Sequence, residues 1–475
     1  EIDIDAHTLT AQYTINDRLA VRSISAVRDI EELSFFNFGE QSTLARGDLQ
    51  EQDQLSQELQ LVGSFLDNVF DFVVGALYFE EDIEIDNPRL GTNHPDGFPI
   101  ENATIVPFQG GNGVNPATSF PVAEFSRSVV DSELESTSFY GYLTWHVQDW
   151  WDIQLGVRDT KIDRDIVGPI VNHDQPPSGS GIVVNSDADS QQDYLFALHF
   201  QPNESTSAYL SYTTSHRPEG ASLISETGAL FKEETADNIE LGVKAAFGQR
   251  ARVGAAVFYT EVADQQLEFA SPENAAIVEI VNANDDSQYQ GFELDASVAV
   301  IEGLEVGFQY SYLDSDIEPF NSPFGPRLDA DIASIALAGG SSLVTAIPGD
   351  KQSEGDRVNF RNAQAPRHSG VFSFDYQFPK FDFGTMDLNI DVISASRFAY
   401  SSTIDDSSSR DIVNARLTVS DIELEEDSGT VKVSLWGKNV RNDDYLVNVV
   451  DLGGGNLRRA YGEPRTYGVD VLYEF

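Results

Sequence analysis

The feature that most constrains this sequence is an alternation of apolar and polar residues that recurs from one end of the chain to the other. Across 304–312, every even position is apolar or aromatic and every odd position is polar or glycine. Similar alternation runs through 151–157, 239–247 and 386–392. Side chains of a β-strand point to opposite faces in turn, so each stretch predicts a strand with one apolar and one wet face. Helical spacing of apolar residues is not sustained anywhere, and the sequence therefore predicts an all-β protein.

The connections between these strands alternate between short and long. The pattern contains about 17 candidate strands, and the short connections hold two or three residues, as at 16–17, 66–68 and 148–149. The long connections are rich in Gly, Pro, Asn, Asp and Ser, and they fall at 31–52, 83–131, 167–187, 217–236, 268–284, 319–363 and 446–461. Short turns at one end of a sheet and long loops at the other are typical of a transmembrane antiparallel β-barrel.

Hydropathy agrees with strands rather than helices as membrane-crossing elements. The longest apolar run, 72–79, is far too short for a membrane-spanning helix. A strand, however, crosses a bilayer with about 9–11 residues of which alternate ones are apolar. Aromatic residues gather near the predicted strand ends, at Trp145, Trp150, Trp151, Tyr310, Tyr312, Tyr467, Tyr473 and Phe475. Such clusters resemble the interfacial aromatic girdles of membrane barrels.

Charge and cysteine content exclude several classes. The chain has 29 Lys and Arg against 78 Asp and Glu, a formal charge of −49, and it contains no cysteine. A nucleic-acid partner is excluded, because counterion release requires a basic face. Disulfides and thiolate metal sites are excluded by the missing cysteines. Apolar residues form 41% of the chain, too many for a disordered acidic tail.

Strand direction gives a further expectation. If all short turns lie on one side, the first strand, about 4–15, and the last, 462–475, run in the same direction. The strand count is then odd, whereas bacterial single-chain barrels have an even number. The only methionine is Met386 and the first residue is Glu1. We therefore expect a truncated barrel that lacks an odd number of N-terminal strands.

Several segments now resemble one family, the TonB-dependent receptors of Gram-negative outer membranes. Residues 462–468, Gly-Glu-Pro-Arg-Thr-Tyr-Gly, followed by alternation to Phe475, closely resemble the closing strand of that family. Residues 433–445 are similar to its penultimate strand. Weaker matches occur at 238–244, 258–260 with 264–265, 291–294 and 365–368. Each match is weak alone, but together they keep the family's order over nearly the whole chain.

The resemblance implies a complete barrel of about 22 strands around an N-terminal plug. Residues 1–475 would then be the barrel domain without its plug and first strands. The implied parent imports a scarce substrate, such as a ferric siderophore or similar iron complex, with energy supplied by a TonB-type protein acting through the missing plug. Tyr473 and Phe475 resemble the signal read by the barrel assembly machinery. An oligosaccharide or corrinoid importer, and a passive porin-like channel, remain alternatives.

Candidate binding residues lie in the predicted outward loops. Aromatic rings and arginines can hold a ligand by stacking and by bidentate contacts. The candidates for substrate binding are Phe35, Phe36, Phe38, His216, Arg217, Phe320, Phe324 and Arg327. The alternative is that these side chains pack loops against one another or against the plug.

Catalytic and cofactor motifs find no support, so no enzyme activity, resident metal or cofactor is predicted. There is no G-x-S-x-G nucleophile elbow. The Gly-rich segments 109–113 and 452–456 lack the strand-to-helix context of a phosphate loop. Asp187, Asp189 and Asp193 resemble the start of a calcium loop but lack its glycine and closing glutamate. An enzymatic outer-membrane barrel is the third alternative and would need a polar catalytic cluster at its rim.

The acidity has two interpretations. It can concentrate cationic or metal-bearing substrates at the mouth of the barrel. It can instead reflect a saline habitat, or divalent cations that bridge the loops to lipopolysaccharide in the surrounding membrane. The acids are spread over loops, lumen and turns alike, which favours the second interpretation.

Overall fold

The structure is a computed structural model of the 475-residue chain. It describes residues 1–37, 44–91, 105–106, 122–169, 181–187, 190–221, 230–270, 278–317, 320–321, 357–358, 364–399, 407–423, 429–451 and 457–474. Among these residues no helix is long and apolar enough to cross a membrane.

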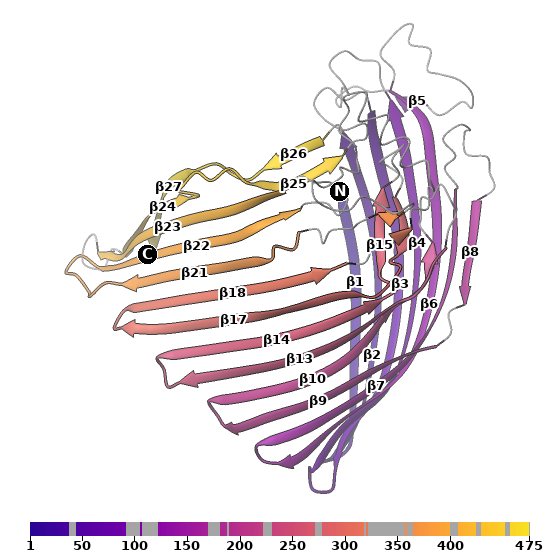
Figure 1. Cartoon of the computed structure of the whole chain (residues 1–475), viewed down its shortest axis with the longest axis horizontal. Coiled ribbons are helices and arrows are strands. Elements are labelled where there is room, and N and C mark those ends of the chain that lie inside the picture. Colours follow the sequence, from indigo (N-terminus) through magenta and orange to yellow (C-terminus); the bar gives the residue numbers. More distant parts are fainter. Residues whose placement is uncertain are drawn as a thin grey trace.

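One large, strongly curved sheet makes up most of the structure (Figure 1). Its long antiparallel strands follow one another in chain order: β1 (Ile2–Asn16), β2 (Leu19–Asn37), β3 (Leu44–Phe65), β4 (Phe70–Gly91), β6 (Val122–Gln148), β7 (Trp151–Pro169), β9 (Gln191–Asn203), β10 (Thr206–Arg217), β13 (Glu234–Phe247), β14 (Ala251–Ala263), β17 (Ser287–Ile301), β18 (Leu304–Asp316), β21 (His368–Gln377), β22 (Thr385–Ala399), β23 (Ser407–Glu423), β24 (Thr430–Lys438) and β27 (Thr466–Glu474). Two short strands, β5 (Ile105–Val106) and β8 (Gly181–Asp187), extend this sheet beside β6 and β7. The all-β, antiparallel prediction is confirmed.

Four small hairpins lie outside the large sheet. They are β11 (Gly220–Ala221) with β12 (Leu230–Phe231), β15 (Gln266–Ala270) with β16 (Val278–Asn282), β19 (Phe320–Asn321) with β20 (Arg357–Val358), and β25 (Leu446–Asp451) with β26 (Leu457–Tyr461). All four follow strands that run away from the short turns. We call the strand ends joined by turns such as 17–18, 149–150 and 302–303 the inner rim, and the opposite ends the outer rim.

The long strands reach further toward the outer rim than the sequence predicts. The predicted loops 31–52 and 83–131 are wrong at both of their ends, because β2 and β3 occupy 31–37 and 44–52, and β4 and β6 occupy 83–91 and 122–131. In these outer halves the outward face carries mostly charged residues, whereas apolar side chains such as Ile85, Val130 and Ile166 lie on the opposite face, so the pattern of the inner halves does not continue. Backbone pairing with neighbouring strands, such as Glu51 with Glu31 and Glu84, nevertheless continues without a break.

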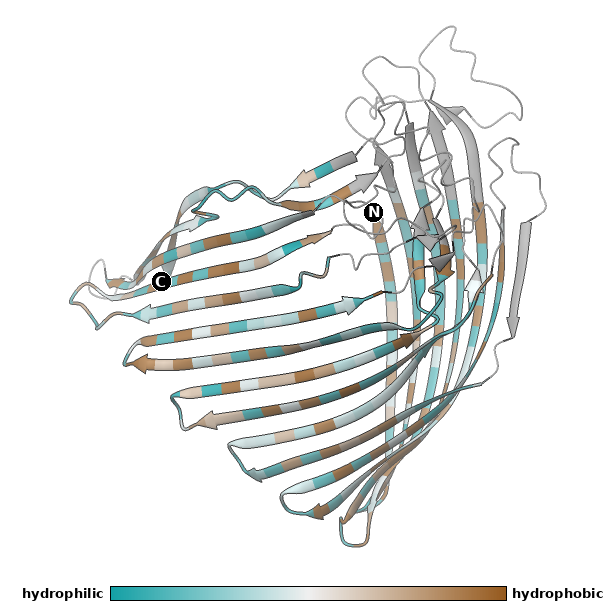
Figure 2. Ribbon diagram, in the orientation of Figure 1, coloured by the Kyte–Doolittle hydropathy of each residue, from teal (hydrophilic) through white to brown (hydrophobic). Residues whose placement is uncertain are grey.

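The two faces of the sheet differ in character toward the inner rim. Large aliphatic and aromatic side chains stand exposed on one face, including Leu59 at 54%, Val74 at 53% and Phe139 at 62%. Their sequence neighbours Glu58 and Tyr140 lie on the other face, where they are hydrogen-bonded to each other. Figure 2 shows the resulting alternation of hydrophobic and hydrophilic positions along many strands. The exposed apolar face lacks any covering protein layer among the described residues.

Strand register also places carboxylates opposite one another on the outward continuation of the apolar face. One row takes a carboxylate from each of six neighbouring strands: Asp5, Asp29, Asp53, Asp82, Glu133 and Asp165. Like charges directly opposite across a sheet are destabilising. The outer halves of these strands are therefore held by backbone pairing against charge repulsion.

Candidate functional site

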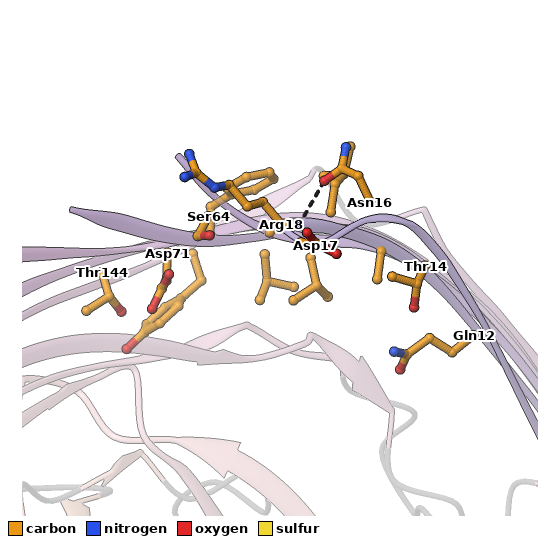
Figure 3. A pocket seen from close by; sticks show the side chains of 15 residues that line it. Gln12, Thr14, Asn16, Asp17, Arg18, Ser64, Asp71 and Thr144 are labelled. Carbon is orange, nitrogen blue, oxygen red and sulfur yellow. Dashed lines mark hydrogen bonds between the residues drawn. The ribbon is translucent and has the colours of Figure 1, made fainter. Parts of the chain in front are cut away.

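The polar face at the inner rim forms a groove of about 490 Å³ whose lining mixes polar and apolar side chains. Figure 3 shows Gln12, Thr14, Asp71 and Thr144 pointing to the same side of the sheet. Nearby, the ring of His146 bridges two carboxylates, with Nε2 2.9 Å from Asp71 and Nδ1 2.8 Å from an oxygen of Asp152 on β7. The inner end of the polar face is thus lined by polar groups that His146 links across β4 and β7.

The same polar face carries two arginines at the outer rim. Arg164 lies on β7 and Arg217 ends β10, and the charge of Arg217 is close enough to act on the Arg164 guanidinium. Burial lowers the pKa of Arg164, Glu81 on β4 opposes this shift, and the charge of Arg217 adds to it. Ile166 and Val130 beside it are buried in a small apolar cluster, which accounts for the desolvation. Arginine stays cationic despite such a shift.

In the part of the chain that the structure describes, no carboxylate pairs directly with this arginine pair. Glu81 is the acid whose charge acts on Arg164. Gln52 and Gln54 donate hydrogen bonds of 2.7 and 2.5 Å to one of its carboxylate oxygens. Among the described residues no carboxylate lies within ion-pair distance of either guanidinium. Two neighbouring cations of this kind favour a bound anion.

His216, the residue before Arg217, is held by an acid. Its Nδ1 lies 3.1 Å from Asp193 of β9, and its side chain is only 9% exposed. Glu233 lies nearby, and burial raises the pKa of its carboxyl group. A protonated His216 would oppose that rise, whereas Glu219 and Asp193 add to it. This corner therefore places a histidine among three carboxyl groups beside the arginine pair.

Gln266 fixes the backbone that carries Arg217. It is 7% exposed, and its side-chain amide donates to the carbonyl oxygens of Pro218 at 2.9 Å and Lys232 at 3.0 Å. Its own N–H donates to Glu234 at 2.6 Å. Asn282 accepts from the Lys232 N–H at 2.7 Å and donates to the Lys232 carbonyl at 3.0 Å. The β15–β16 hairpin thus clamps the β11–β12 hairpin in place.

The predicted binding residues are not all gathered here. His216 and Arg217 lie at this site. Phe35 and Phe36 lie at the outer end of β2, so their assignment to a loop is wrong, and Phe320 belongs to β19. Phe38, Phe324 and Arg327 lie outside the described residues.

Sequence reasoning missed Arg164, Gln266 and Asn282. Arg164 lies in an unbroken strand, and it gains its partner only because β7 and β10 reach the same rim. Gln266 follows a segment, 258–265, whose resemblance to the family could have drawn attention to it. Its role depends on contacts with a hairpin distant in sequence, and no local pattern signals those contacts.

The predicted assembly-signal residues lie at the end of the chain. Tyr473 is 45% exposed on the apolar face of β27, whereas Phe475 lies outside the described residues. Trp145 and Trp150 are exposed near the inner rim, and Trp150 contacts Trp151 and Phe200 at centroid distances of 6.1 and 5.3 Å. This aromatic cluster has the position expected of an interfacial girdle.

Fold and site together define a class of protein. A long antiparallel sheet with an exposed apolar face, a polar opposite face, short turns at one rim and an aromatic girdle is the wall of a transmembrane β-barrel.

Family comparison gives the particular group within that class. The family model described as "TonB dependent receptor-like, beta-barrel" matches residues 1–440. This chain therefore belongs to the TonB-dependent receptor family, whose members are outer-membrane transporters and receptors of Gram-negative bacteria rather than enzymes. The resemblance seen in the sequence is confirmed, and the polar face is the lumenal wall.

Known proteins similar to this chain include several receptors. The probable TonB-dependent siderophore receptor PiuA of Acinetobacter baumannii is 25% identical over 201 residues, which is 40% of this chain and 25% of the relative. The ferric yersiniabactin uptake receptor FyuA of Yersinia pestis superposes with a TM-score of 0.67 at 17% identity, over 99% of this chain and 61% of FyuA. The copper transporter OprC superposes with a TM-score of 0.65 at 12% identity, over 99% of this chain and 65% of OprC.

These structural likenesses are likenesses of fold. The chain spans 61% of the length of FyuA and 64% of the solved PiuA structure, which it matches with a TM-score of 0.62 at 16% identity. Receptors for ferric siderophores and a copper transporter share the fold, so substrate choice must come from particular residues.

Proposed function

We propose that this chain forms the barrel wall of an outer-membrane receptor that imports an anionic iron complex, such as a ferric siderophore. Family membership and the siderophore-receptor relatives support energised import. The paired guanidinium groups of Arg164 and Arg217, at the outer end of the lumen in a chain of net charge −49, support an anionic substrate. Uncomplexed cations would instead collect at the acidic rows on the outward face.

In this proposal the arginines receive the substrate and the clamp positions them. Each guanidinium offers a planar fork of donors that matches carboxylate or catecholate oxygens. Gln266 keeps Arg217 at the rim by fixing Pro218 and Lys232. Import energy is supplied by a TonB-type protein through a plug that fills the lumen. The remaining predicted contacts, Phe35, Phe36, Phe38, Phe320, Phe324 and Arg327, stay candidates for ligand stacking and pairing.

Uptake of radiolabelled ferric siderophores tests this function. A host without its own siderophore receptors would express the receptor together with its plug under iron limitation, and accumulation would be measured with and without a protonophore. Each of Arg164→Met and Arg217→Met should lower apparent affinity by about tenfold or more, because a hydrogen bond to a charged group contributes about 1.5–3 kcal/mol. Arg250→Met, at an exposed inner-rim turn, is the matched control.

The outcomes separate the alternatives. Accumulation that continues in the presence of the protonophore would support a passive porin-like channel. Energised uptake of neutral oligosaccharides, unaffected by either arginine substitution, would overturn the anionic iron complex as substrate.

A further inference from the structure

A third arginine lies on the lumenal wall, inward of the pair at the outer rim. Arg158 is on the same face of β7 as Arg164, and on that face Thr160 and Ile162 stand between them. Register identifies the face as lumenal, because Arg158 lies directly opposite Tyr140 of β6. The Arg158 side chain is exposed, so its charge faces the lumen and not the lipid.

Hydroxyl groups hold the Arg158 guanidinium in place. Its Nε donates to Thr160 Oγ1 at 3.1 Å, and a terminal nitrogen donates to Ser138 Oγ at 2.9 Å. Both hydroxyls are buried, and they lie 3.0 Å from each other. Neutral hydroxyls orient the planar group but leave its positive charge uncompensated. The guanidinium is therefore fixed, with further N–H donors left for an anion.

Two acids close to Arg158 in the sheet are engaged with other groups. Asp193 lies directly opposite Arg158 on β9 but pairs with His216 at 3.1 Å. Glu58 accepts the hydroxyl hydrogen of Tyr140. In the described part of the chain no ion pair includes Arg158. Its charge is therefore available to a ligand in the lumen.

Distance separates this group from the pair at the rim. The guanidinium reaches outward only to Thr160, which leaves about 13 Å of strand between it and Arg164. That span exceeds the Debye length of about 8–10 Å at physiological ionic strength, so exposed charges at the two places act separately. An anion bound at the rim gains little from Arg158 and meets its donors after moving inward along β7.

We propose that Arg158 is a second anion-binding site on the import route, which binds the imported complex after it leaves Arg164 and Arg217. Its ligand is the anionic iron complex proposed above, bound through carboxylate or catecholate oxygens, so this inference rests on the proposed function. Glu58 and Glu81 on the same wall repel such a ligand, whereas the fixed donors of Arg158 attract it. Arg158 thereby governs the rate of inward passage and not the affinity at the rim.

Separate measurements of binding and import test this inference. Cells expressing the receptor together with its plug would be given ferric citrate or a ferric tris-catecholate labelled with radioactive iron. Arg158→Met should lower the maximal rate of energised uptake by about tenfold and change the dissociation constant of de-energised cells by less than about twofold. Arg158→Lys keeps the charge and should recover part of the rate. Arg416→Met is the matched control and should import at the parent rate, because Arg416 is already paired with Asp470 at 2.7 Å.

A thiol at the same position separates ligand contact from a structural role. The chain contains no cysteine, so Arg158→Cys introduces a single thiol into it. Substrate should slow the reaction of that thiol with methanethiosulfonate reagents during uptake. A trimethylammonium reagent should restore import, whereas a sulfonate reagent should not. A thiol that reacts neither at rest nor during uptake would show that the position is covered, which contradicts the proposal.

The remaining outcomes distinguish this inference from the function on which it rests. Resistance to SDS without heating gives the amount of folded receptor, and every rate is divided by that amount. If Arg158→Met imports at the parent rate while Arg164→Met and Arg217→Met lose affinity, the second site is refuted and the proposed function stands. An equal loss of affinity in all three variants would place the arginines in one site and refute the second site as well. Parent-level affinity in both rim variants would refute the proposed function, and this inference with it.

Discussion

Replacement of Gly75 by alanine should destabilise the barrel wall, although alanine usually suits a strand better than glycine. Gly75 lies on the lumenal face of β4, directly opposite Tyr140 of β6. The phenol ring of Tyr140 lies over the glycine, and an added Cβ would fall 2.5 Å from the hydroxyl oxygen and still closer to the ring. The ring would therefore have to move.

The cost in unfolding free energy follows from the hydrogen bonds that the Tyr140 ring would lose if it moved. The Tyr140 hydroxyl donates to the carboxylate of Glu58 and accepts a hydrogen bond of 3.1 Å from Gln60. A bond to a charged group contributes about 1.5–3 kcal/mol and a neutral one about 0.5–1.5 kcal/mol, with the lower values suited to half-buried groups. Alanine recovers about 0.5–1 kcal/mol over glycine in a strand. We expect a net loss of about 1–3 kcal/mol.

Equilibrium unfolding in urea, followed by tryptophan fluorescence of the full chain in detergent–lipid micelles, measures this loss. Gly254→Ala is the matched control, because its Cβ would make only an ordinary 3.4 Å contact with Asp295. It should gain about 0.5–1 kcal/mol. In a Tyr140→Ala background, Gly75→Ala should cost nothing, since the ring it displaces is absent. If Gly75→Ala were as stabilising as Gly254→Ala, the inferred role of the ring would be wrong.

Three further outcomes are expected. Gln266→Ala should increase hydrogen–deuterium exchange of the β11–β12 hairpin and weaken ligand binding about tenfold, because two carbonyls lose a buried donor; unchanged exchange would argue against the clamp. Glu233→Gln should raise stability near neutral pH and flatten its pH dependence. The carboxyl pKa is raised in the folded state, so its contribution is favourable below the unfolded pKa and is lost as pH rises through the folded value. A steeper pH profile in the variant would contradict this assignment. Asp53→Asn should raise the urea midpoint in dilute buffer and have less effect in 1 M salt, because its opposed neighbours Asp29 and Asp82 are then screened; a salt-independent gain would exclude charge repulsion as the cause.

The sequence predicts where strands form because the alternation of apolar and polar residues lies within each strand. A two-residue period fixes which side chains share a face, and 304–312 and 239–247 show this without knowledge of any partner strand. The signal fails at the outer ends of β2 and β3, where Phe35 and Phe36 lie in a strand that was expected to be a loop. On the outward face carboxylates such as Asp29 and Asp53 replace apolar residues there, so the apolar alternation is interrupted although backbone pairing continues.

Sequence by itself determined the fold class, the family and the apolar face that meets lipid. Tertiary structure alone decided which side chains meet across strands. Arg164 and Arg217 lie close together, Gln266 holds the backbone at Pro218, and the Tyr140 ring lies over Gly75. The physical reason is that alternation depends on each strand separately, whereas these contacts depend on the register between strands, and register is set by pairing along the whole sheet.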